Sequence, residues 1–171
     1  MRIASQVFLA YFALLIMATV WRLVPGTQVV PDIVAIFAAY LGLTARSRVA
    51  GAALGAAAIG YLGDLLLGTP VGLQATTAAL VCVFGHLIHR RMLVRGLGLT
   101  VMFSLLIGAV AALVSLGLRA YFDLLGEGGI GWGVMFLTVL MTGIFGPIAF
   151  VAANALDRRF VRTSHLQSSI Q

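Results

Sequence analysis

The sequence of 171 residues has no lysine, a single cysteine and very few charged side chains. Charged residues make up 9%, against about 25% in typical soluble domains. Cys82 lies alone within an apolar stretch, so the sequence supports neither a disulfide framework nor a thiolate metal site. No Ser–His–Asp arrangement, pair of carboxylates or zinc signature indicates catalysis. We therefore predict a protein that is not an enzyme and that needs no cofactor or metal.

Apolar residues are correspondingly abundant, at 61% of the chain. They form six long stretches, and a soluble domain of this composition would expose far too much apolar surface. The sequence predicts an all-α, polytopic membrane protein built as a six-helix bundle. The expected spans are 3–23, 30–44, 49–67, 70–89, 97–121 and 130–156, the last with a kink at Pro147. We expect residues 1–157 to form a single six-span transmembrane domain and residues 158–171 to form a short, polar, disordered cytoplasmic tail.

All eleven basic residues are arginines, and their distribution predicts the orientation of the chain. With the N-terminus in the cytoplasm, nine arginines fall in inner segments and only Arg22 and Arg119 fall outside. Four of the five acidic residues then lie at the outer side. Both termini are thus expected in the cytoplasm. Membrane lipid is an expected partner, since the same arginines attract anionic headgroups. Nucleic acid is not, because the arginines are spread over loops and form no basic face.

Two short segments carry helix-boundary signals. Gly68 suits the position after a helix end, Thr69 suits an N-cap, and Pro70 suits the first position of the next helix. Pro31 and Asp32 likewise indicate a helix start, with proline first and an acid favoured by the helix dipole. We therefore predict a tight antiparallel hairpin around Gly68.

An acid near the end of the third span, Asp64, should have a partner or access to water, because an intramembrane carboxylate is costly. Arg22 and Arg119 end spans on the same side, and Asp32 opens one there. The sequence predicts an outer ionic cluster of Asp64 and Asp32 with one or both arginines. Such a cluster either locks helix ends together or forms a partner or ligand site.

Small residues line the third span in two rows that allow close helix packing. Gly51 and Gly55 form a GxxxG pair, and Ala52, Ala56 and Gly60 form a second row. These rows can pack against the chain's own helices, which we favour, or against the single span of a partner.

The segment from Gly60 to Leu73 resembles the central signature of the rod shape-determining protein MreD family. That signature is a glycine-rich helix ending in G-x-x-x-D-x-x-x-G-x-x-x-G. Pro31-Asp32 at the start of an apolar second span is also similar to the family, as are the chain length and the short loops. The resemblance marks seven candidate site residues for partner binding: Pro31, Asp32, Gly60, Gly63, Asp64, Gly68 and Gly72.

The resemblance implies a non-enzymatic scaffold in the bacterial inner (cytoplasmic) membrane. MreD-like proteins bind the bitopic protein MreC and support peptidoglycan synthesis and rod shape. They do so with a RodA-type glycosyltransferase and a class B penicillin-binding protein, alongside MreB filaments. The family fold is similar to the S component of energy-coupling-factor transporters.

That fold similarity supplies an alternative function, a vitamin-binding S component. Its outer-facing pocket would need many specific polar groups, and the outer half of this chain offers few: Arg22, Gln28, Asp32, Asp64, Gln74 and Arg119. A retained small molecule would favour the transporter, and a single-span partner would favour the scaffold.

Overall fold

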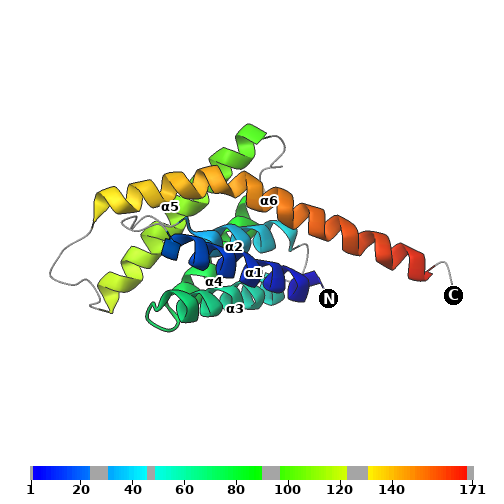
Figure 1. Cartoon of the computed structure of the whole chain (residues 1–171), viewed down its shortest axis with the longest axis horizontal. Coiled ribbons are helices and arrows are strands. Elements are labelled where there is room, and N and C mark those ends of the chain that lie inside the picture. The colour runs from blue at the N-terminus through cyan, green and yellow to red at the C-terminus, as the bar shows by residue number, and fades with distance from the viewer. Residues whose placement is uncertain (1, 24–30, 46–48, 90–96, 123–130, 169–171) are drawn as a thin grey trace.

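In a computed structural model, the described part of the chain is all-helical, with six α-helices (Figure 1). The backbone is described for residues 2–23, 31–45, 49–89, 97–122 and 131–168, and side chains for 6–20, 31–45, 49–88, 98–122 and 131–155. The helices are α1 (Arg2–Leu23), α2 (Ile33–Thr44), α3 (Val49–Leu67), α4 (Leu73–His89), α5 (Leu97–Tyr121) and α6 (Trp132–Ser168). The six predicted helices are therefore confirmed.

Among the residues whose side chains are described, three segments are long and apolar enough to cross a membrane: Val49–Leu67, Gly98–Tyr121 and Trp132–Ala155. The described parts of the other three helices give shorter apolar segments: Gln6–Val20, Ile33–Thr44 and Leu73–Ile88. The predicted bounds of α3 and α5 are confirmed, whereas α4 begins three residues later than expected.

The C-terminal tail differs from the expectation, since α6 continues to Ser168 rather than giving way to a disordered segment. Its last turns project beyond the other helices in Figure 1. No glycine or proline follows Pro147, so no helix-breaking residue type ends the helix there.

Helix α2 forms the centre of the bundle and contacts each of the other five helices. Every residue from Val34 to Gly42 is buried. Because this helix is apolar on all sides, burial against several neighbours is its stable arrangement. Glycines let α4 approach it closely: Gly42 faces the Cys82 carbonyl, and a Cβ added at Gly85 would lie 3.2 Å from the Ala39 carbonyl oxygen.

The small residues of α3 are used mainly inside this chain. Gly55 is buried, as are Ala52, Ala56 and Gly60 of the second predicted row, while Gly51 is half-buried. A Cβ at Gly60 would collide with the backbone of Gln74 at the start of α4. The close contact between α3 and α4 therefore depends on the missing side chain at this glycine.

Hydrogen bonds join α6 to the first two helices, although most of the core is apolar. The buried Gln6 amide in α1 donates to the Ala153 carbonyl over 3.3 Å. The Tyr40 hydroxyl in α2 donates to the Asn154 amide oxygen over 3.1 Å. Since polar groups in an apolar core need partners, these bonds fix α6 against the centre of the bundle.

Candidate functional site at one end of the bundle

The turn between α3 and α4 is built around Asp64, which is 1% exposed. The Thr69 backbone N–H donates to the Asp64 carbonyl over 3.2 Å, and Gly68 adopts φ +67°. This bond and the left-handed glycine form a Schellman end to α3. The predicted role of Gly68 is confirmed.

The Asp64 carboxylate caps the N-terminus of α4. It accepts hydrogen bonds from the Thr69 hydroxyl at 2.6 Å and from the backbone N–H groups of Gly72 at 2.8 Å, Gln74 at 3.0 Å and Ala75 at 3.4 Å. The first N–H groups of a helix lack partners within the helix, so a carboxylate there both satisfies donors and meets the positive end of the dipole. Asp64 is thus an N-cap of α4 that is supplied by α3.

This arrangement corrects two predictions. Thr69 is not the N-cap of α4, because its hydroxyl donates to Asp64 instead, and Pro70 is not the first helical residue, because α4 begins at Leu73. The intervening turn is completed by Gly72 at φ +97°, a conformation that side-chain-bearing residues rarely adopt. The tight hairpin itself is present.

Backbone N–H groups and a hydroxyl, rather than an arginine, surround the Asp64 carboxylate. Among the residues with described side chains, no ion pair joins Arg119 to Asp64 or to Asp32, and the Arg22 side chain lies outside the described residues. The predicted ionic cluster is therefore replaced, at Asp64, by helix capping. The physical reason is that a helix N-terminus offers several fixed donors at once, without the entropy cost of holding a long side chain.

Asp32 caps α2 in the same way but locally. Its Oδ1 accepts from the Ala35 backbone N–H at 2.9 Å, and its own N–H donates to the Thr142 hydroxyl of α6 at 2.9 Å. The predicted helix start at this acid is confirmed, although Pro31 precedes the cap and is not the first helical residue. The entry to α2 is thus tied to α6.

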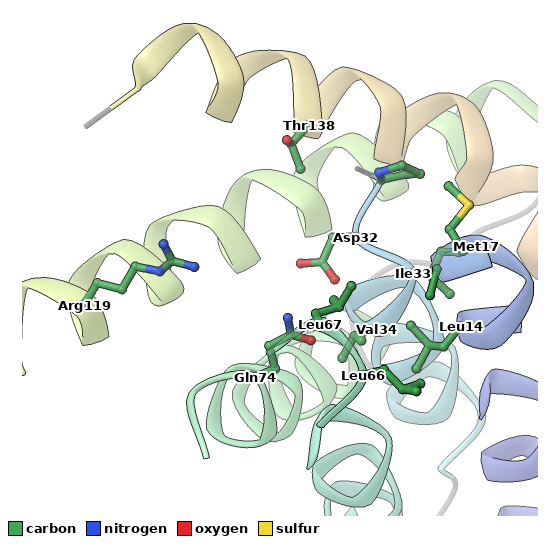
Figure 2. Close-up of a pocket in the computed structure, with 12 residues that line it drawn as sticks. Leu14, Met17, Asp32, Ile33, Val34, Leu66, Leu67, Gln74, Arg119 and Thr138 are labelled. Atoms are coloured by element: carbon green, nitrogen blue, oxygen red, sulfur yellow. The ribbon is translucent and has the colours of Figure 1, made fainter. Parts of the chain in front are cut away.

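A cavity of about 460 Å³ lies above the N-terminus of α2, where all six helices contribute to its wall (Figure 2). A 12-residue helix spans only about 18 Å, so the longer neighbouring helices extend past its start and enclose this space. The walls are mostly apolar, and the lining residues are Leu14, Met17, Ala18, Pro31, Asp32, Ile33, Val34, Leu66, Leu67, Gln74, Arg119 and Thr138.

Few polar groups face this cavity, and they come from four helices or their caps. Figure 2 shows the Asp32 carboxylate and the Gln74 amide directed toward the same space, with Arg119 farther out on α5. The Gln74 side-chain oxygen is buried and has no hydrogen-bond partner. In the described part of the chain, the Ala35 N–H is the only group that donates a hydrogen bond to the Asp32 carboxylate.

The structure therefore places the predicted site residues in three locations. Gly60, Gly63, Asp64, Gly68 and Gly72 form the α3–α4 junction. Pro31, Asp32 and Arg119 line the cavity, and Gly51 and Gly55 lie earlier in α3.

Two polar residues of this region were missed as structural partners, Gln74 and Thr142. Gln74 lies in the first turn of α4 and both contacts Asp64 through its N–H and lines the cavity. Thr142 is fully buried in α6 and follows Thr138 by one helical turn. A pair of threonines four residues apart on one face of an otherwise apolar helix was the available signal.

Comparisons of the chain with protein-family models, curated proteins and solved structures give no match. Among the described residues, no group of three or more His, Cys, Asp or Glu side chains could hold a metal ion. The site must accordingly be interpreted from its own geometry.

Proposed function

We propose that this protein is a scaffold of the bacterial cell-elongation machinery, of the MreD type, that binds an MreC-like single-span protein. The observation that supports the proposal best is that the marked residues from Gly60 to Gly72 together build one helix junction. Each marked residue has a physical role in it: Gly60 and Gly63 face Gln74, Asp64 caps α4, and Gly68 and Gly72 take positive φ. The spacing that resembles the family is thus the spacing that one rigid helix junction requires.

The proposal places all six helices in the inner membrane with both termini in the cytoplasm. The three long apolar segments and the uneven distribution of arginines support it. In this orientation the junction and the cavity lie at the periplasmic end. There the α3–α4 junction would hold the surface beside which MreC and the RodA-type and penicillin-binding enzymes assemble.

The partner helix would contact an exposed face, because the buried small residues of α3 already pack within the chain. The outward face of α3 is apolar, and Leu54, Tyr61 and Leu65 are 73%, 46% and 58% exposed. Helix association in lipid depends on van der Waals packing, so such a face can seat a single span without any polar contact.

The test combines co-purification with cell shape. The tagged chain and an MreC-like partner are expressed together in a rod-shaped bacterium that lacks its own copy of the chain. We expect the double variant Leu54→Ala/Leu65→Ala to lose most partner recovery and rod shape at normal abundance. Ile144→Ala/Ile148→Ala, on the exposed face of α6, is the matched control and should retain both.

Failure of the unaltered chain to recover a single-span partner or to restore rod shape would refute the scaffold proposal. Equal effects of the two double variants would refute only the α3 face as the contact.

The cavity is the specific observation that favours the alternative, a vitamin-binding S component. Its volume of about 460 Å³ lies within the range of small-molecule sites. Mass spectrometry of the purified protein distinguishes the two functions. A stoichiometric vitamin-like molecule together with an ATPase-linked coupling subunit would establish the transporter component.

A further inference from the structure

We propose that the cavity above α2 binds a zwitterionic amphiphile that carries a primary ammonium, with the ammonium at Asp32 and the anionic group toward Arg119. A phosphatidylethanolamine headgroup has this chemistry. The inference requires the helices to lie in a membrane but does not depend on the identity of the protein partner.

An unmatched acceptor at the floor of the cavity defines the ammonium position. One Asp32 oxygen holds the Ala35 N–H, which leaves the second oxygen available to the cavity. The Gln74 side-chain oxygen is not part of this position, because it is buried against Gly63 of α3. A carboxylate oxygen in a mostly apolar cavity needs a donor, and a primary ammonium supplies N–H groups for it.

A cation at the mouth gives the site its second charge. Arg119 lies in the last turn of α5, is exposed, and lines the same cavity. Figure 2 shows its side chain directed from α5 toward the Asp32 side of the space. An anionic group such as a phosphate matches the guanidinium, so a zwitterion can pair its ammonium with the Asp32 carboxylate inside and its anion with Arg119 outside.

The apolar walls suit the rest of an amphiphile. Leu14 and Met17 of α1 and Leu66 and Leu67 of α3 border the same space, and Leu67 is 45% exposed. Apolar side chains thus continue from the cavity to the outer surface of the bundle. A hydrocarbon chain attached to the headgroup can follow them and gain burial roughly in proportion to its contact area.

The experiment compares two lipids that differ only in N–H donors. The protein is placed in nanodiscs of equal parts phosphatidylethanolamine and phosphatidylcholine with identical acyl chains, and native mass spectrometry measures which lipid is retained. We expect a preference of about tenfold for the ethanolamine lipid, the factor that one hydrogen bond to a charged group supplies. The choline headgroup has the same charges but no N–H to donate.

Variants then locate the lipid. Asp32→Asn should bring the preference close to parity while preserving the cap, since asparagine caps helices well. Asp157→Asn, which removes an equal charge about 28 Å along α6 from Thr138, should leave it unchanged. Circular dichroism of each variant confirms that the helices remain folded.

Soluble glycerophosphoethanolamine tests the source of the ligand. If glycerophosphoethanolamine displaces the lipid when the two are at similar concentrations, the natural ligand is a soluble molecule with the same ammonium and anionic groups. If it does not displace the lipid, the ligand is the lipid itself. Equal retention of the two lipids by the unaltered protein, or an unchanged preference in Asp32→Asn, would overturn the proposal. So would a bound molecule without an ammonium group in this cavity. These results leave partner co-purification unaffected and so are separable from failure of the scaffold proposal.

Discussion

Replacement of Asp64 should destabilise the protein in graded steps, because its two carboxylate oxygens divide the four hydrogen bonds equally. Oδ1 accepts from the Thr69 hydroxyl and the Gln74 N–H, and Oδ2 accepts from the Gly72 and Ala75 N–H groups. Asp64→Asn keeps one acceptor oxygen and turns an amide NH2 toward two donors. Each buried donor left without an acceptor costs about 1–3 kcal/mol, so the two donors lead us to expect that Asp64→Asn loses about 2–6 kcal/mol of unfolding free energy.

Two further variants bracket this value. Asp64→Ala removes both acceptor oxygens and should lower the free energy of unfolding by about 4 kcal/mol or more, as is found when a buried hydrogen-bond network is broken. Thr69→Val removes a single donor and leaves the carboxylate its three backbone partners, so it should cost about 1 kcal/mol. Leu65→Ala, beside Asp64 on the exposed face, is the control and should change stability by less than about 0.5 kcal/mol.

The assay is reversible unfolding in mixed micelles with rising sodium dodecyl sulfate, followed by far-ultraviolet circular dichroism. The expected order of loss is Asp64→Ala, then Asp64→Asn, then Thr69→Val. An Asp64→Asn variant as stable as the unaltered protein would refute the capping argument, because the shared carboxylate would then contribute nothing. A larger loss in Thr69→Val than in Asp64→Asn would refute the assignment of the backbone donors.

Three other outcomes follow from local geometry and use the same unfolding assay or a labelling reaction. Gly60→Ala should lower the free energy of unfolding by about 2 kcal/mol, because the added Cβ collides with the α4 backbone. Gly117→Ala, which has open space around it, should raise the free energy of unfolding by up to about 1 kcal/mol. Equal effects of the two variants would contradict the close packing at Gly60. Thr142→Val should lose about 1–2 kcal/mol because the Asp32 N–H loses its acceptor, and an unchanged free energy would argue against that bond. Cys82 is fully buried and should react with maleimide only after unfolding, so rapid labelling of the native protein would place it elsewhere.

The sequence predicts the helices well because apolar stretches and helix-breaking residues mark their bounds. Gly68 shows this at single-residue level, since its place after a long apolar run predicts the positive φ that the structure has. The predictions fail at the start of α4, where Thr69 and Pro70 have the right local preferences. A carboxylate from the preceding helix outcompetes Thr69 as the cap, and local propensity contains no information about such a tertiary contact.

The candidate site is harder to predict than the helices. Burial of Asp64 and a helix start at Asp32 could be inferred from position alone, but the partner of Asp64 could not. An arginine is the obvious partner in a list of residues, whereas backbone N–H groups are present at every position and become visible as partners only in three dimensions. The cavity was equally hidden, because it results from the shortness of α2 relative to its neighbours.

The unequal helix lengths have a consequence for the lipid around the molecule. The 17 residues of α4 extend about 26 Å, against about 30 Å for a typical hydrocarbon core, while the 25 residues of α5 extend about 38 Å. In a bilayer, α5 must tilt and the leaflets beside α4 must thin, each at a modest cost per ångström of mismatch. The protein would then carry a thinned patch of membrane on one flank, and two copies could lower the total deformation by bringing those flanks together.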